Sequence, residues 1–363
     1  MYIVTNRKVS KRKGSFEIFE KTPNSNGPNE LRLLKMDKEN GKRVFTRLND
    51  KISQKRVKEI NSNFNLSLDE KKKWFASLDV ACNLFNKAKI QSKNILVFVH
   101  GYNNDMNDII VTAEKLEKAY NVLVLVFSWP ANGGGFFSGT AQYVGDKSDA
   151  RVSTGALNRF LEKLHNYHAM LTTAQVDSLW RKAKDKHIDN HEEARSEYAK
   201  LQQKMCKINI NLLCHSMGNY VLKYATIPSD TSLDIPIFDN VCLVAADVNN
   251  KKHAEWVEKI EARSGVYVVI NKNDSALKWS RVKPGKAQQA RLGHYIKSLN
   301  AQNTTYIDVS SAKYVDDDHS YFKDNPIEKN LKLKALFSDL FEGRKAEEKL
   351  EYKADINAYI PFQ

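Results

Sequence analysis

The sequence has no long apolar run and few cysteines, and both absences exclude classes of protein. Its longest apolar runs, NILVFV and VLVLVF, are far too short to cross a bilayer. The opening MYIVTNRKVSKRKG lacks the apolar segment of a secretory signal. The four cysteines are widely spaced and form no CxxC pair, which indicates neither a disulfide framework nor a zinc finger. We therefore expect a soluble, cytoplasmic protein.

Acidic residues are outnumbered by basic ones, so the chain carries a net charge of +14. A basic surface attracts phosphates non-specifically, whether they belong to nucleic acid or to anionic lipid. The lysines alternate with Glu and Asp, as in EKKKWF, which is typical of solvated helix faces. Because no nucleic-acid recognition motif accompanies the charge, we do not expect nucleic acid as a dedicated partner. The sequence identifies no protein partner.

The first part of the chain differs in pattern from the rest. Up to about residue 60, short β-like runs alternate with turn signals, which predicts antiparallel strands at one edge of a sheet. Ser67 and Glu70 then have the spacing of a capping box and are followed by apolar residues at helical intervals. This pattern predicts a helix that starts at Ser67.

From residue 94 onward, continuous apolar runs alternate with helical stretches. Fully buried strands of this kind imply a mostly parallel sheet covered by helices on both faces. We expect strands at NILVFVH, VLVLVF, KININLLCH, NVCLVAADV, GVYVVINKND and TTYIDVS, and helices at DIIVTAEKLEKAY, GNYVLKYAT, HAEWVEKI and residues 287–298. The repeated βαβ unit predicts a doubly wound α/β fold, which we assign to a single domain over residues 1–363.

A long polar segment at residues 165–204 interrupts this alternation. It is strongly helix-forming and much longer than an ordinary connection, so we interpret it as a helical insertion that serves as a lid or an interaction element. Within it, His187 and His191 have the i,i+4 spacing of two metal ligands on one helix. No third ligand is identifiable, so an exposed helix face is the better interpretation, and we expect no metal site.

The stretch INLLCHSMGNYVL has the features of a nucleophile elbow, because it places Ser216 directly after an apolar strand and directly before a helix. The usual G-x-S-x-G motif has glycine on both sides, whereas here the flanking residues are Cys214 and Gly218. Cys214 lies back on the strand, so we expect a packing residue rather than a nucleophile. Serine also favours helix N-caps, which leaves a capping role open for Ser216.

Acyl transfer by serine also requires N–H donors for an oxyanion, a histidine base and an acid that orients the base. The loop that starts at His100 follows the first buried strand. In proteins with a nucleophile elbow, this loop donates part of the oxyanion hole. The backbone N–H groups of Tyr102 and Met217 are the natural donors. We expect His100 to hold this loop by hydrogen bonding rather than to act as the base.

The acid and the base are expected downstream of the nucleophile. Asp247 and Asp274 both follow later strands and qualify as the acid, with a loop cap as the alternative role of each. Of three candidate bases, His253 lies in an apparent helix and His294 lies ahead of an expected one. His319 occupies the loop after the last strand and precedes a helix near residue 326, so we predict that it is the base.

Three acidic residues, Asp316, Asp317 and Asp318, stand next to His319 in the sequence. Nearby carboxylates favour the charged form of an imidazole and raise its pKa. The sequence therefore predicts an activity that declines at mildly acid pH.

Seven segments carry a family resemblance: VHGYN, FSWP, CHSMGN, LVAADV, NKNDSAL, RLG and DDDHSYF. In this order they resemble a family of bacterial α/β-hydrolases of the esterase/lipase superfamily that has long been described only as a domain of unknown function. YIVTNR is similar to that family's first strand, and Tyr143 with Asp146 to its Y-x-x-D segment. The resemblance implies the α/β-hydrolase fold and Asp274 as the acid, with Asp247 as the alternative. We expect the insertion at residues 165–204 to have no counterpart in that family.

The sequence thus predicts a serine hydrolase that cleaves a carboxylic ester through Ser216, His319 and Asp274 and needs no cofactor. Its substrate is a small-molecule or lipid ester. Phe136 and Phe137, in the loop ANGGGFFSGTAQY, and the basic surface suit peripheral contact with an anionic membrane, although a packed surface loop is the better interpretation. The alternative function is an interaction or effector module on a hydrolase scaffold, in which the insertion binds a partner.

Overall fold

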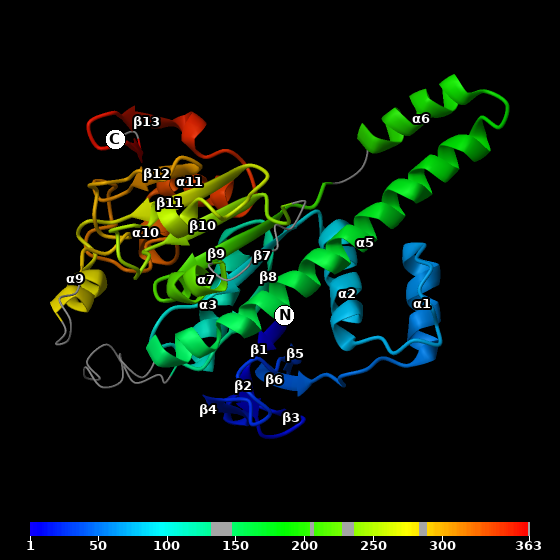
Figure 1. Ribbon diagram of the computed structural model, residues 1–363, viewed down its shortest axis with the longest axis horizontal. Coiled ribbons are helices and arrows are strands. Elements are labelled where there is room, and N and C mark those ends of the chain that lie inside the picture. The colour runs from blue at the N-terminus through cyan, green and yellow to red at the C-terminus, as the bar shows by residue number, and fades with distance from the viewer. Residues whose placement is uncertain (132–146, 204–206, 227–235, 283–288, 362–363) are drawn as a thin grey trace. The chain divides into compact units, whose positions relative to one another are not determined.

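The computed structural model describes residues 1–131, 147–203, 207–226, 236–282 and 289–361 (Figure 1). The chain divides into two compact units. The first unit consists of Met1–Arg47, Asn94–Arg159 and Asn209–Gln363, and the second unit of Leu48–Lys93 and Phe160–Ile208. Phe136, Phe137, Tyr143 and Asp146 lie outside the described residues. In the described part of the chain, no helix combines the length and the apolar character needed to cross a membrane.

The first unit is built on a sheet of 12 strands in the order β13-β14-β12-β11-β10-β9-β7-β8-β1-β5-β6-β3, counted over the described residues. Its six central strands are parallel: β7 (Asn94–Val99), β8 (Val122–Ser128), β9 (Ile210–His215), β10 (Asn240–Val244), β11 (Gly265–Ile270) and β12 (Thr304–Asp308). They coincide with the six apolar runs of the sequence. The predicted doubly wound α/β fold is therefore confirmed.

Further strands extend this sheet at both edges: β1 and β14 pair parallel with the central strands, and the strands beyond them pair antiparallel. At the N-terminal edge, β1 (Tyr2–Thr5) joins β8 to β5 (Arg32–Glu39), followed by β6 (Lys42–Arg47) and β3 (Lys13–Gly14). The hairpin of β13 (Leu350–Lys353) and β14 (Ala358–Pro361) lies at the other edge, and β2 (Arg7–Val9) pairs separately with β4 (Phe19–Pro23). The expected antiparallel edge is confirmed, but it ends at Arg47 instead of near residue 60.

Both faces of the central strands are buried, as expected for parallel strands. Side chains alternate between the faces of a strand, so Leu96 and Phe98 of β7 point to one face and Val97 to the other. Leu96 and Phe98 belong to a core cluster with residues of α3 (Met106–Ala119) and α11 (Leu331–Phe341). Val97 is fully buried as well. The α7 helix (Gly218–Thr226), which follows β9 in the chain, packs against that strand.

The helix predicted over residues 287–298 is absent from its described part, which consists of turns. Gly293 explains the difference, because a Cβ at this residue would lie 2.1 Å from Ala246 N. Gly293 N also donates a hydrogen bond to Ala246 O at 3.0 Å, and Gly293 O accepts one from Asn271 N at 3.0 Å. Backbone contacts with neighbouring loops thus override the local helical preference. The helix expected at HAEWVEKI is a single turn, α8 (Ala254–Val257).

The second unit is helical and has its own core, formed by Val57, Ile60, Leu68, Leu78, Cys82 and Leu171. Its first helix, α1 (Gln54–Phe64), was not predicted, and α2 (Ala76–Gln91) begins at Ala76 instead of Ser67. The side chain of Asn61 accepts a hydrogen bond from Leu68 N at 2.9 Å and donates one to Leu68 O at 3.0 Å. Because these bonds hold Leu68 in a non-helical turn, the predicted capping box does not form.

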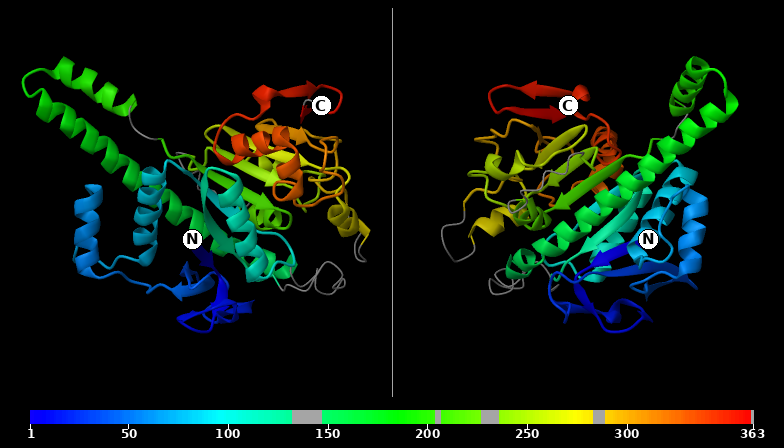
Figure 2. Two further views of the ribbon diagram at one scale, coloured as in Figure 1. Left: turned by 180° about the vertical axis from the view of Figure 1, so that it is seen from behind. Right: turned by 45° about the vertical axis from the view of Figure 1, so that its right-hand side comes forward.

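The expected helical insertion is present as a pair of helices, α5 (Thr154–Lys186) and α6 (His191–Gln203). The α6 helix folds back along α5, where Trp180 packs edge-on against Tyr198 at 5.2 Å between ring centroids (Figure 2). A turn separates His187 from His191, so the two imidazoles do not share one helix. His187 Nδ1 instead hydrogen-bonds Glu193 at 2.9 Å. Among the described residues, no group of three or more metal-binding side chains is arranged to hold an ion.

Candidate active site

Ser216 lies in the turn between β9 and α7, at the carboxyl end of the central strands. Its φ of 54° falls in the left-handed region, which residues other than glycine rarely adopt. The α7 helix begins only at Gly218, and within the described chain the Oγ of Ser216 makes no hydrogen bond. The capping role is therefore wrong for Ser216. A strained serine at a strand-to-helix turn is typical of a nucleophile elbow.

Two glycines permit close packing around this turn. A Cβ at Gly218 would lie 2.5 Å from Val99 O, so only glycine lets the start of α7 approach the end of β7. A Cβ at Gly101 would lie 2.7 Å from Ser216 Cβ and 3.2 Å from its Oγ. The loop after β7 therefore touches the serine. Among the described residues, Met217 N–H has no acceptor, as expected at the start of a helix.

His100 holds this loop through both ring nitrogens. Its Nδ1 donates to Gly101 O at 2.9 Å, and its Nε2 accepts from Trp129 N at 3.1 Å. The imidazole also stacks on the Trp129 ring at 5.1 Å between centroids. Burial, together with the charge of Arg7, lowers the pKa of His100 to about 3. The imidazole is therefore neutral at physiological pH, and the structural role predicted for it is confirmed.

Arg7 is a buried cation that sequence reasoning missed. It is 2% exposed, and its Nε donates to Ser128 Oγ at 3.0 Å. Its Nη2 donates to Asn104 O at 3.3 Å and to Ala131 O at 3.2 Å. Arg7 thus ties the loop beside Ser216 to the end of β8. The available signal was a single arginine in the otherwise uncharged opening run, YIVTNR.

His319 and Asp274 are brought together from two loops. Asp274 is fully buried, and its Oδ2 accepts a hydrogen bond from His319 Nδ1 at 2.7 Å. Its Oδ1 accepts from Leu277 N at 2.9 Å, so the same carboxylate caps α9 (Ser275–Val282). His319 itself lies between β12 and α10 (Asn325–Lys329). One carboxylate therefore both caps α9 and hydrogen-bonds His319.

His319 lies close to the serine turn. His215, which precedes Ser216, donates from Nε2 to His319 O at 2.9 Å, and the two imidazole rings are 4.7 Å apart. Burial and the neighbouring His319 lower the pKa of His215, which is consistent with a neutral donor. In the described part of the chain, no hydrogen bond joins Ser216 Oγ to His319 Nε2. Such bonds often shorten only when substrate binds.

The pKa of His319 is raised above its ordinary value of 6.5. Burial, the strongest single influence, opposes protonation, but the charge and the hydrogen bond of Asp274, followed by the charges of Asp247 and Asp318, outweigh it. The direction agrees with the sequence prediction. The cause is different, because Asp274 contributes more than any of the three aspartates that precede His319 in the sequence.

Asp247, the alternative acid, has other partners. Its Oδ1 accepts a hydrogen bond from Ser280 Oγ at 2.7 Å and lies 2.9 Å from Arg291 Nε. Both members of this ion pair are buried. Asp247 N donates to Ser216 O at 3.1 Å. Asp247 thus supports the backbone of the serine turn, while the carboxylate that binds His319 belongs to Asp274.

The remaining candidate residues are occupied elsewhere or are unreactive. His253 is bound by Asn250 O at 2.7 Å and by Tyr306, and it precedes α8 instead of lying within it. His294 lies in a turn. Cys214 is fully buried, and burial raises the pKa of its thiol well above the ordinary value. It is therefore a neutral packing residue, as predicted.

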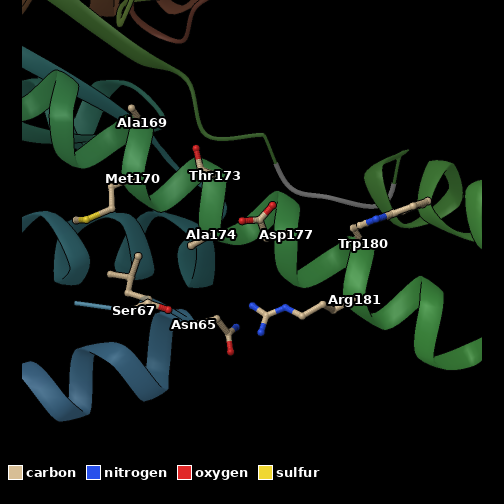
Figure 3. A pocket seen from close by; sticks show the side chains of 10 residues that line it. Asn65, Ser67, Ala169, Met170, Thr173, Ala174, Asp177, Trp180 and Arg181 are labelled. Atoms are coloured by element: carbon tan, nitrogen blue, oxygen red, sulfur yellow. The ribbon is translucent and has the colours of Figure 1, made fainter. Parts of the chain in front are cut away.

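A pocket of about 700 Å³ lies within the second unit, between the segment after α1 and the middle of α5. Figure 3 shows the side chain of Arg181 extending across it toward Asn65. Asp177 and Trp180, which also belong to α5, line the pocket as well. The pocket contains none of the residues predicted for catalysis.

One family model matches the chain, and its description reads "Alpha/beta hydrolase of unknown function (DUF900)". The match covers residues 79–173 and 181–331, which include Ser216, Asp274 and His319. The two matched ranges are separated by residues 174–180, which lie within the insertion. No curated protein and no solved structure matches the chain. The resemblance of the sequence segments is confirmed, and the chain belongs to this alpha/beta hydrolase family of unknown function.

Proposed function

We propose that the protein is a serine hydrolase that cleaves carboxylic esters, with Ser216 as nucleophile and His319 as base. The observation that carries this proposal is the 2.7 Å hydrogen bond between His319 and the buried Asp274, beside a serine held at a φ of 54°. Membership of an alpha/beta hydrolase family supports a hydrolytic reaction. A small-molecule or lipid ester is the proposed substrate.

Each group has one task in the proposed mechanism. Asp274 accepts a hydrogen bond from the Nδ1–H of His319, which holds the tautomer whose unprotonated Nε2 can take the proton of Ser216 Oγ. The serine attacks the ester carbonyl, and the N–H groups of Tyr102 and Met217 bind the oxyanion. His319 then returns the proton to the departing alcohol. Water, deprotonated by the same imidazole, releases the acid from the acyl-enzyme.

Labelling with a fluorophosphonate probe tests the nucleophile. We expect the wild-type protein to be labelled, Ser216→Ala to be unlabelled, and Ser67→Ala, a change at an exposed serine of the second unit, to be labelled normally. Circular dichroism verifies that each variant is folded. A folded wild-type protein that does not react would contradict the proposal and favour the alternative of an interaction module whose α5–α6 pair binds a partner.

Paired substitutions of the two aspartates test the acid. We expect Asp274→Asn to lower kcat toward a p-nitrophenyl ester by roughly 10⁴, because the wrong histidine tautomer is then favoured. Asp247→Asn should retain far more activity, since that side chain does not hydrogen-bond His319. Equal losses in both variants would contradict the assignment of Asp274. A panel of esters of rising chain length, with a phospholipid, separates esterase from lipase activity.

A further inference from the structure

We propose that a pocket of about 480 Å³ in the first unit, lined by Lys251, Lys252 and Arg281, binds an anionic group of the substrate. The substrates would then be esters whose acyl or alcohol part carries a carboxylate or a phosphate. The identity of the bound molecule as a substrate rests on the proposed esterase function, whereas anion binding by the pocket does not.

The lining of this pocket is unbalanced in charge. Three of its residues are cationic and none is acidic. Lys252 pairs with Glu255 at 3.0 Å, but both side chains are largely exposed. Lys251 and Arg281 have no carboxylate partner in the described part of the chain. An anion between them offsets the repulsion of like charges, and a guanidinium binds a carboxylate or phosphate through two parallel hydrogen bonds.

The floor of the pocket is held in place before any ligand binds. Asn250 is 4% exposed, and its backbone N donates to Ala290 O at 2.7 Å. Its side-chain Nδ2 donates to Lys297 O at 2.8 Å. Next to it, Arg291 Nη1 donates to Asn249 Oδ1 at 2.6 Å. Because these bonds fix the two loops that form the floor, less conformational entropy is lost when an anion binds.

The pocket is built from the same loops that surround the serine. Asp247 N donates to Ser216 O at 3.1 Å, and Asn250 follows Asp247 by three residues. Three residues span at most about 11 Å even when fully extended. Arg281 belongs to α9, the helix capped by Asp274. Only a short stretch of backbone therefore links the serine turn to this pocket.

Two matched esters test the preference for an anionic substrate. The acyl chains of p-nitrophenyl hydrogen glutarate and p-nitrophenyl valerate have the same number of carbons, and only the former ends in a carboxylate. We expect the wild-type protein to favour the glutarate ester in kcat/KM. In the double variant Lys251→Glu with Arg281→Glu this preference for the glutarate ester over the valerate ester should fall about tenfold or more. Lys259→Glu, the same charge reversal at an exposed lysine outside the pocket, is the control.

Calorimetry on the Ser216→Ala protein tests anion binding without catalysis, with glutarate for a carboxylate and glycerol 3-phosphate for a phosphate. We expect at least one of them to bind, and the charge-reversal substitutions, added to Ser216→Ala, to abolish binding. If neither anion binds, or binding survives the substitutions, the proposal is overturned. If an anion binds in this way but no ester is hydrolysed by the wild-type protein, the anion site stands and the esterase function fails.

Discussion

Ser216 keeps its strained conformation because its backbone is hydrogen-bonded on both sides. Its N–H donates to Val244 O at 3.1 Å, and its carbonyl accepts from Asp247 N at 3.1 Å and from Asn219 Nδ2 at 3.0 Å. Strain of this kind persists only where the surroundings over-determine the local geometry. The strained backbone of Ser216 therefore lowers the stability of the fold, and it places Oγ at the strand end.

This strain predicts that Ser216→Gly is more stable than Ser216→Ala. Glycine adopts a φ of 54° without a steric penalty, whereas alanine retains the penalty. We expect the free energy of unfolding to be about 1 kcal/mol higher for the glycine variant. Urea denaturation of the two inactive variants measures the difference. A glycine variant that is less stable than the alanine variant would show that the turn is not strained.

The raised pKa of His319 predicts how activity depends on pH. The base must be neutral, and protonation sets in as the pH falls through a pKa that lies above 6.5. We therefore expect kcat/KM to decline below that pKa and to be small at pH 5. The same shift contributes stability to the fold below pH 6.5, and this contribution is lost as the pH rises through the folded-state pKa.

A pH–rate profile from pH 5 to 9 measures this decline. Asp318 has the weakest of the cited effects on the pKa of His319. Asp318→Asn should therefore shift the acidic side of the pH–rate profile only slightly. A profile that is flat from pH 5 to 8 would contradict a histidine base with a raised pKa.

Helices α11 and α6 have similar lengths but are held by different amounts of packing. In α11, Leu333, Leu336, Phe337, Asp339, Leu340 and Phe341 are buried, and Asn330 caps its start by accepting a hydrogen bond from Leu333 N at 3.0 Å. In α6, Ala194 is the one buried residue. Helices of this length are marginal without tertiary packing, so α6 depends on its contacts with α5.

We therefore predict that the amides of α6 exchange with solvent faster than those of α11. Local opening costs less free energy where few apolar contacts are broken. Hydrogen–deuterium exchange followed by mass spectrometry resolves the two helices. Trp180→Ala, which removes the contact of α5 with Tyr198, should accelerate exchange in α6 and leave α11 unchanged. Equal protection of both helices in the wild-type protein would contradict this prediction.

At the scale of the whole molecule, the two units have separate cores. The first unit's large cluster includes residues from the sheet, α3 and α11, whereas the second unit's cluster holds only a few buried side chains. Because separate cores allow separate unfolding, we expect this chain to depart from a two-state transition. The smaller core offers less buried apolar surface to stabilise its unit.

Buried cysteines in the two units can show which unit unfolds first. Cys82 lies in the second unit, and Cys214 and Cys242 lie in the first. We expect rising urea to expose Cys82 to an alkylating reagent before Cys214 and Cys242, because the second unit unfolds first. Mass spectrometry of the alkylated peptides gives the three midpoints. Coincident midpoints would show that the two units unfold together.

Much of the fold follows from local sequence pattern. Most of the central strands are continuous apolar runs that can be recognised without knowledge of their neighbours. The serine turn is also local, because Ser216 and Gly218 belong to one strand-turn-helix segment. His319 was located by its order along the chain, after the last strand. These features depend on residues close together in the sequence, and the family match agrees with them.

Other features depend on contacts between distant segments, and only the tertiary structure decided them. Asp274 and Asp247 both follow a strand, but Asp274 meets His319 across 45 residues while Asp247 is held by Arg291. Arg7 reaches Asn104 across 97 residues to support the loop beside the serine. The turns around Gly293 replace a predicted helix because neighbouring backbone fills the space. Local propensity carries no information about such pairings, since their hydrogen bonds and buried charges form only when the chain has folded.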